Sequence, residues 1–298
     1  MTPFGNNLVA MATPMTPTGA IDQTSLTSLI THLLATHADG LVVAGTTGES
    51  PTLTPEETTH LIHTVKSQTT TRAKVIAGIG TYNTAESTTR AQAAQEAGAD
   101  ALLLVTPYYS RPTQQGVIAH CTAIADATDL PVMLYDVPAR TGTPLDESTL
   151  ITLASHPKIQ AVKDAKGDLF QAMSVMSRTS LAYYSGIDEL NLAYLACGAT
   201  GVVSVTGNIA AAHNADLIHA VRSNNLTKAQ AINRDLIPIT NALLRTSQGA
   251  IMAKAALAHL GIIDHASVRL PLLESPPDHL HHLTAALSTL PARQHPAR

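Results

Sequence analysis

Short apolar runs rich in β-branched residues recur along the chain, and each is followed by a stretch with helical character. The first run covers 8–12 and precedes a predicted helix over 22–36. The seven later strand and helix pairs are 41–44 with 55–67, 75–77 with 84–97, 101–105 with 114–127, 131–135 with 145–155, 159–163 with 168–178, 181–184 with 188–197, and 201–204 with 208–221. Strands that are apolar throughout and alternate with helices predict a parallel sheet covered by helices.

Eight strand and helix units over about 225 residues favour an α/β fold, the (β/α)₈ TIM barrel. An open doubly wound sheet is the alternative that the number of strands leaves open. After residue 224 the alternation stops, and three helical stretches follow with no β-rich run between them, at 226–245, 250–260 and 277–290. We therefore expect a catalytic barrel over 1–224 and a helical C-terminal extension over 225–298 that packs on it, with a frayed tail from 291.

The composition argues against several classes of protein. Hydrophobic residues make up 45% of the 298 residues, which is enough for a large core. Eighteen basic residues against 22 acidic ones give a net charge of −4, so no basic excess is available for nucleic acid. The apolar runs are far shorter than the roughly 20 residues of a membrane helix. The chain starts without a secretory signal and contains two cysteines, so we expect a cytoplasmic location.

Lys163 is the most informative single residue. Chemistry in a parallel barrel lies at the carboxyl ends of the strands, and Lys163 ends the run 159–163, where it should point into the barrel mouth. Removal from water disfavours the charged form of an amine, and a neutral amine there could form a Schiff base with a carbonyl compound. The alternative is a structural ion pair with Asp164 or another carboxylate. Position alone leaves both interpretations open.

Two residues near the preceding strand end could assist such a lysine. Tyr135 ends the run 131–135, and its hydroxyl could exchange protons with an imine intermediate, although a core tyrosine would look the same. Arg140 follows on the next loop and offers the planar fork that binds a carboxylate. A solvated loop arginine is the alternative.

Two further loops carry candidate groups. Residues 45–50, Gly-Thr-Thr-Gly-Glu-Ser, place the hydroxyls of Thr46 and Thr47 where they could bind a small anion, or they form an ordinary turn. Residues 106–112 hold two adjacent tyrosines between prolines, which suggests a rigid loop that presents one phenol. Packing at a subunit interface is compatible with that role.

The sequence gives little support for a metal or a dinucleotide. Gly78-Ile-Gly80 lacks the third glycine of a dinucleotide fingerprint, because Asn83 stands in its place. The histidines at 279, 281 and 282 fall on a predicted terminal helix without carboxylates around them, which is typical of a solvated helix face.

Taken together, the strand ends resemble the dihydrodipicolinate synthase/N-acetylneuraminate lyase family of pyruvate-dependent class I aldolases. The resemblance covers nearly the whole chain, from 12–15 to the C-terminal helices. It rests on five motifs in order, at 45–50, 106–112, 135–142, 162–167 and 201–206. It implies a TIM barrel, a Schiff-base lysine and no metal or organic cofactor, since the protonated imine is itself the electron sink.

The resemblance also implies a role for each candidate residue. It implies that Lys163 forms the imine with pyruvate and that Tyr135 is the general acid and base, in a proton relay with Thr46 and with Tyr109 of a neighbouring subunit. It also implies that Thr47 holds the pyruvate carboxylate and that Val203 packs against pyruvate. Arg140, by the same resemblance, positions the relay and binds the carboxylate of a second substrate. The family further implies a homotetramer built as a dimer of dimers.

Two positions favour the synthase branch, because the lyases typically have Ser at the place of Thr46 and an apolar residue at that of Arg140. The implied reaction is the condensation of pyruvate with L-aspartate 4-semialdehyde to 4-hydroxy-tetrahydrodipicolinate, the first committed step toward diaminopimelate and lysine. One alternative is a related aldolase that acts on a sugar-derived 2-keto acid, such as N-acetylneuraminate or a keto-deoxy sugar acid. Another is a non-catalytic homologue, against which the intact set of candidate residues argues.

Several positions depart from the family pattern. The residues at three positions near the barrel mouth are unusual for the family, namely Asp136, Asp164 and Ile187. The feedback site for lysine in regulated members has histidines and an asparagine where this chain has Pro55, Thr58 and Tyr82, although Glu86 and Tyr108 remain. We therefore expect weak or absent inhibition by lysine.

Overall fold

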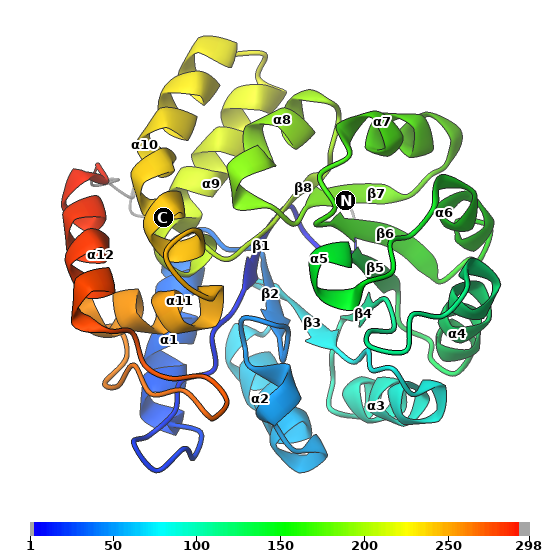
Figure 1. The fold of residues 1–298 in the computed structure, drawn as a ribbon, viewed down its shortest axis with the longest axis horizontal. Coiled ribbons are helices and arrows are strands. Elements are labelled where there is room, and N and C mark those ends of the chain that lie inside the picture. Colours follow the sequence, from blue (N-terminus) through cyan, green and yellow to red (C-terminus); the bar gives the residue numbers. More distant parts are fainter. Residues whose placement is uncertain (1–2, 292–298) are drawn as a thin grey trace.

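Eight parallel strands close into a barrel in sequence order in the computed structural model, which describes residues 3–291 (Figure 1). Leu8 on the first strand pairs with Val203 on the last, so the sheet has no open edge and the open-sheet alternative is wrong. The predicted (β/α)₈ TIM barrel is confirmed. The strands are β1 (Asn7–Ala10), β2 (Gly40–Val43), β3 (Lys74–Gly78), β4 (Ala101–Val105), β5 (Val132–Asp136), β6 (Ile159–Asp164), β7 (Ala182–Ser185) and β8 (Gly201–Ser204).

Helices surround the barrel and continue beyond its last strand. Those that follow successive strands are α1 (Gln23–Ala35), α2 (Pro55–Thr69), α3 (Thr84–Glu96), α4 (Gln114–Asp126), α5 (Pro138–Thr141), α6 (Glu147–Leu153), α7 (Leu169–Arg178), α8 (Asn191–Ala196) and α9 (Gly207–Arg222). Three more complete the described chain, α10 (Leu226–Leu244), α11 (Gly249–His259) and α12 (Pro277–Thr289), and two short 3₁₀ turns are η1 (Ser50–Thr52) and η2 (Asp188–Leu190).

Most helices begin where a side chain satisfies the first free backbone amides. Asp22 accepts hydrogen bonds from two amides of the first turn of α1, and Asn83 does the same for α3. Thr54 and Glu57 form a reciprocal capping box at the start of α2. These caps fix the loops between strands and helices, and those loops form the barrel mouth.

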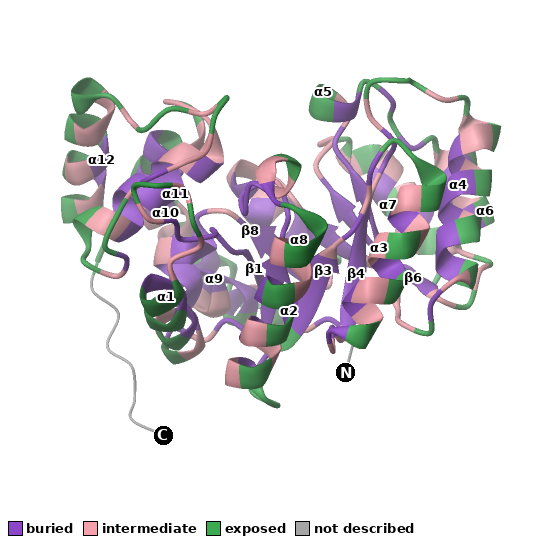
Figure 2. Cartoon of the chain, turned by 90° about the horizontal axis from the view of Figure 1, so that it is seen from below, coloured by how far each residue is buried: buried purple, intermediate pink, exposed green. Residues whose placement is uncertain are grey.

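The core consists of two apolar layers that lie on opposite faces of the strands. Side chains such as Val9, Leu104 and Val162 pack outward against the helices. Others, including Met133 and Tyr184, point inward and fill the barrel. Figure 2 shows the buried residues along the strands and on the inner faces of the helices. Because successive side chains of a strand point to opposite faces, the strand neighbours of these outward-pointing residues face the barrel axis.

The last three helices lie on one side of the barrel next to α9 (Figure 1). An apolar cluster joins α9 to them, and it includes Leu217, Ile232, Leu243, Met252 and Leu283. The division of the chain at residue 224 stays a prediction. Residues 292–298 lie outside the described residues, and with them most of the tail that we expected to fray. None of the helices within 3–291 is both long and apolar enough to cross a membrane.

Candidate active site

Lys163 and Tyr135 face each other across neighbouring strands inside the barrel. The register of β5 and β6 pairs the two residues directly, and Nζ of Lys163 lies 4.0 Å from the centroid of the Tyr135 ring. Both side chains are buried, with exposures of 5% and 6%. Thr106 fixes the backbone at this point, because its amide and its hydroxyl both donate to the carbonyl of Tyr135 at 3.1 Å. The structure therefore brings together the two residues that the sequence singled out.

Asp164 does not pair with the candidate lysine. Its Oδ1 instead accepts hydrogen bonds from the backbone amides of Lys166, at 2.8 Å, and Gly167, at 3.3 Å. Burial raises the pKa of Asp164, and these hydrogen bonds oppose that shift. Within residues 3–291 the structure contains no ion pair of Lys163 with a carboxylate. The ion-pair interpretation of Lys163 is therefore wrong, and its amine faces an aromatic ring instead.

Thr46 and Thr47 lie on a tight turn after β2. The turn is closed by hydrogen bonds from the Ser50 amide to the Gly45 carbonyl and from the Glu49 amide to the Thr46 carbonyl, both 3.2 Å. The end of β3 approaches this turn closely, and a Cβ on Gly78 would lie 2.2 Å from the carbonyl oxygen of Ala44. Only glycine permits that approach.

A cavity of about 510 Å³ opens at the carboxyl ends of the strands. Its walls come from the segments that follow β2, β3, β4 and β5, from the first half of α3 and from the end of β4. They are formed by Thr46, Ser50, Pro51, Gly80, Thr81, Tyr82, Glu86, Arg90, Val105, Tyr108, Val137, Arg140 and Thr141. A smaller cavity of about 30 Å³ shares Thr46 and Arg90 with the first and is lined by Tyr135 as well. The two cavities share part of their walls, and the smaller one reaches the Tyr135 side chain.

Arg140 lies at the rim of the larger cavity. It belongs to α5, a four-residue helix that ends at Gly142, whose φ of 72° is a left-handed conformation suited to glycine. The side chain is exposed and free to meet a solute that enters. This short helix is absent from the elements that we predicted, which place a loop there.

The remaining candidates occupy different surroundings. Val203 is buried in the apolar interior of the barrel in the same cluster as Tyr135, and Thr47 is buried beside Thr46. Tyr109 is 91% exposed, with a φ of 69°, and does not enter the site of its own chain. The contribution of Tyr109 to a neighbouring subunit's site stays a prediction.

Asp188 organises a polar cluster at the end of β8 that sequence reasoning missed. Its carboxylate accepts from the amides of Val205 and Thr206, at 2.8 and 3.1 Å, and from the hydroxyls of Ser204 and Thr206. Ile187, directly before it, is half-buried beside Gly167. The available signal was an acidic residue three positions after the end of β7, but the partners on β8 and its loop lie 16 to 18 residues away.

Glu49 and Lys254 form a buried ion pair that joins the threonine turn to α11. Neither side chain is more than 1% exposed. The other carboxylate oxygen of Glu49 accepts from the amide of Arg269 at 2.9 Å, and the Lys254 ammonium also donates to the Ser267 carbonyl. Burial lowers the pKa of Lys254, and Glu49 opposes that shift. The C-terminal region thereby contacts the loop that carries Thr46.

Chemically, the site offers the Lys163 amine and the Tyr135 phenol inside the barrel, and the Thr46 hydroxyl and the Arg140 guanidinium at the wall of the large cavity. Within the described residues, no group of three or more His, Cys, Asp or Glu side chains could hold a metal ion. A closed parallel barrel with these groups at its mouth defines the class of (β/α)₈-barrel enzymes.

The chain belongs to the dihydrodipicolinate synthetase family, whose model matches residues 3–290. The 4-hydroxy-tetrahydrodipicolinate synthase of Kineococcus radiotolerans is 45% identical over 286 residues, which are 96% of this chain and 93% of the relative. Among solved structures, a dihydrodipicolinate synthase from Bacillus anthracis superposes with a TM-score of 0.94 at 38% identity, and the match covers 98% of this chain and 100% of that one.

A second similar structure contains a bound ligand. The chloride-inhibited dihydrodipicolinate synthase from Acinetobacter baumannii, complexed with pyruvate, superposes with a TM-score of 0.93 at 36% identity, covering 97% of this chain and 99% of that one. The chain is thus an enzyme of a lyase family, and its relatives favour the synthase branch over the sugar-acid lyases.

Proposed function

We propose that this protein condenses pyruvate with L-aspartate 4-semialdehyde to give 4-hydroxy-tetrahydrodipicolinate, the first committed step toward diaminopimelate and lysine. The observation that carries the proposal is the buried Lys163 amine, which has the Tyr135 ring 4.0 Å away. The names of the relatives and the pyruvate complex of one structural neighbour support the choice of substrates.

Lys163 supplies the nucleophile in the first half of the reaction. Its Nζ adds to the C2 carbonyl of pyruvate, and loss of water gives a protonated imine. The imine draws electrons from the neighbouring carbon, so a proton leaves the methyl group and an enamine forms. Thr47 holds the pyruvate carboxylate, and Val203 packs against the substrate.

The second half forms the new carbon–carbon bond. The enamine carbon attacks the aldehyde of the semialdehyde, and the resulting alkoxide takes a proton. The amine of the semialdehyde then adds to C2 and displaces Lys163, which closes the ring. Tyr135 gives and takes the protons of these steps through a relay with Thr46 and a neighbouring subunit's Tyr109, while Arg140 binds the semialdehyde carboxylate.

The proposed function is tested by comparing substrates. Purified protein is assayed with pyruvate plus L-aspartate 4-semialdehyde, and separately with N-acetylneuraminate and with keto-deoxy sugar acids. We expect turnover of the first pair and none of the sugar acids above background. Turnover of a sugar acid with no condensation of the first pair would overturn the proposal.

We also propose that the protein acts as a homotetramer, a dimer of dimers, in the cytoplasm. The 91% exposure of Tyr109, on a loop that adjoins the large cavity through Tyr108, supports a partner subunit at this face. A cytoplasmic location agrees with the use of central metabolites as substrates.

Feedback by lysine is expected to be weak or absent. Tyr82 and Tyr108 stack edge to face with ring centroids 5.3 Å apart at the wall of the large cavity, together with Glu86. Pro55 and Thr58 stand where regulated members of the family have histidines, so they provide no imidazole for binding lysine. A titration with L-lysine should leave the initial rate nearly unchanged, whereas strong inhibition at sub-millimolar lysine would contradict this expectation.

A further inference from the structure

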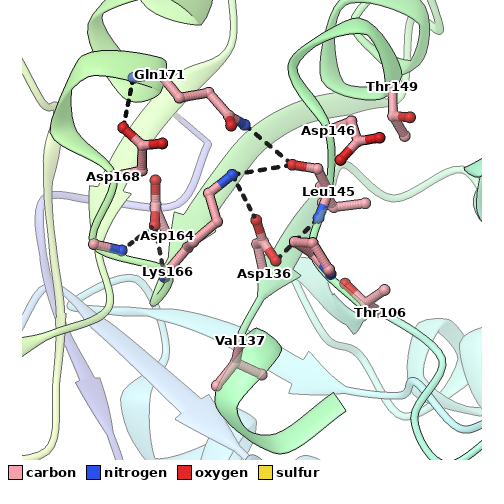
Figure 3. A network of polar contacts seen from close by, with 12 residues as sticks. Thr106, Asp136, Val137, Leu145, Asp146, Thr149, Asp164, Lys166, Asp168 and Gln171 are labelled. Atoms are coloured by element: carbon pink, nitrogen blue, oxygen red, sulfur yellow. Dashed lines mark hydrogen bonds and ion pairs between the residues drawn. The ribbon is translucent and has the colours of Figure 1, made fainter. Parts of the chain in front are cut away.

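The loop that carries Arg140 is closed at its base by one side chain. The chain leaves β5 at Asp136, forms α5 and returns at Leu145, where the Leu145 amide donates to Oδ1 of Asp136 at 3.2 Å. Asp136 thus joins the two ends of the segment 136–145. Figure 3 shows this closure, with α5 beginning just beyond Val137.

Lys166 contacts the same point from the turn that follows the neighbouring strand, β6. Its Nζ donates to the Leu145 carbonyl at 3.2 Å and lies 3.8 Å from Oδ2 of Asp136 (Figure 3). Gln171 donates to that carbonyl as well, at 3.0 Å. The turn that presents Lys166 is fixed by Asp164, which is the last residue of β6 and follows Lys163 directly in the sequence. The base of the Arg140 loop is therefore tied to the strand of the candidate nucleophile.

The contact between Asp136 and Lys166 lies away from water. The two side chains are 2% and 16% exposed. Asp136 also faces the carboxylates of Asp164 and Asp146, and the buried phenol of Tyr183 lies within its electrostatic reach. Burial raises the pKa of Asp136 to about 7, and Lys166 opposes that shift. The charge on Asp136, and with it the attraction to Lys166, therefore changes near neutral pH.

We propose that Asp136 and Lys166 are positioning residues that hold the Arg140 loop in place for the carboxylate of the second substrate. The proposal rests on the proposed function, since it concerns how L-aspartate 4-semialdehyde is bound. α5 is four residues long and its arginine is exposed, so the loop depends on its base for a fixed position. Pyruvate would meet the strand residues and the threonine turn instead. Loosening the base should therefore weaken binding of only one of the two substrates.

The first test is the Lys166→Met variant, which removes the ammonium and keeps most of the side-chain volume. We expect the KM for L-aspartate 4-semialdehyde to rise about tenfold, because an Arg140 loop without a fixed position binds the carboxylate of that substrate more weakly. The KM for pyruvate and the yield of the pyruvate adduct should stay unchanged. Lys166→Arg, which keeps the charge and the donors, should restore most of the affinity.

Lys158→Met is the matched control. Lys158 precedes β6 at the opposite end of the barrel, where its Nζ likewise donates to a backbone carbonyl, that of Thr128, and lies 3.5 Å from a carboxylate, that of Asp129. Its loss should leave both KM values unchanged. Equal rises of the semialdehyde KM in Lys158→Met and Lys166→Met would assign the effect to general loosening and overturn the proposal.

Asp136→Asn is the second variant and tests the charge itself. The amide oxygen can still accept from the Leu145 amide, so the loop stays closed while the attraction to Lys166 is lost. In the native protein the semialdehyde KM should fall from about pH 6 to about pH 8 as Asp136 ionises. In the variant this fall should be absent, and a fall of the same size would contradict the proposal.

The outcomes separate the inference from the proposed function. If the native protein does not condense pyruvate with the semialdehyde, the proposed function and the inference both fail. If the native protein is active and Lys166→Met leaves the semialdehyde KM unchanged, only the inference fails. If Lys166→Met raises the KM values of both substrates by the same factor and also lowers kcat, the role of Lys166 is structural and the inference is overturned.

Discussion

At the scale of single residues, the contact between Lys163 and Tyr135 explains why a lysine can lie inside an apolar barrel. The ring offers its negative face to the amine at 4.0 Å, without the permanent charge of a carboxylate. The hydroxyl of the same tyrosine is the group that we propose for proton transfer.

Tyr135→Phe should separate these two contributions. The variant keeps the ring over Nζ and removes the hydroxyl, so the pyruvate adduct should still form on Lys163. The rate of condensation should fall about 100-fold to 1,000-fold, which is within the usual range for loss of a general acid or base. Steady-state kinetics and a thermal melting midpoint close to that of the native protein check this expectation. An unchanged kcat would remove Tyr135 from the proton relay.

Lys163 could be found from the sequence because a lysine at the end of an apolar strand is costly and therefore conspicuous. Lys254 was passed over because it lies in a helical stretch, where lysine is common. Its partner Glu49 lies 205 residues earlier in the chain, so that only the fold brings them together. Lys166 is inconspicuous for a different reason, because it follows a strand in a predicted loop, where a solvated lysine is also common.

At the scale of helices and strands, most boundaries agree with prediction to within a few residues. The strands of a parallel barrel are buried on both faces, so each one appears in the sequence as an apolar run. The exceptions are short elements. α5 spans only four residues after a proline, too few to show a helical period, and the single helix predicted over 188–197 is divided into η2 and α8.

The pair of Glu49 and Lys254 links two of these elements, and its loss should destabilise the protein. Lys254→Met leaves the Glu49 carboxylate buried without its partner, which typically costs about 3–5 kcal/mol of unfolding free energy. Chemical denaturation measures the change. Lys228→Met, at an exposed position on α10, is the control and should change the stability by less than about 0.5 kcal/mol. A similarly small effect of Lys254→Met would contradict the structural role of the pair.

At the scale of the whole molecule, the site is incomplete in one chain if Tyr109 acts in a neighbouring subunit. Tyr109→Phe and Lys163→Ala should each be nearly inactive alone. A mixture that exchanges subunits should regain activity, because the Lys163 of one variant then meets the Tyr109 of the other. The two variants are unfolded and refolded either together or separately, and the condensation activity of the two samples is compared. No recovery, with mixed oligomers demonstrated by mass, would contradict a shared site.

In the proposed function, the chemistry of the whole molecule depends on imine formation at Lys163. The protein is incubated with pyruvate, reduced with borohydride, digested and mapped by mass spectrometry. We predict one reduced pyruvate adduct, located on Lys163, in the native protein and none in Lys163→Ala. An adduct on another lysine, or no adduct in active native protein, would contradict the assignment of Lys163 as the residue that forms the Schiff base.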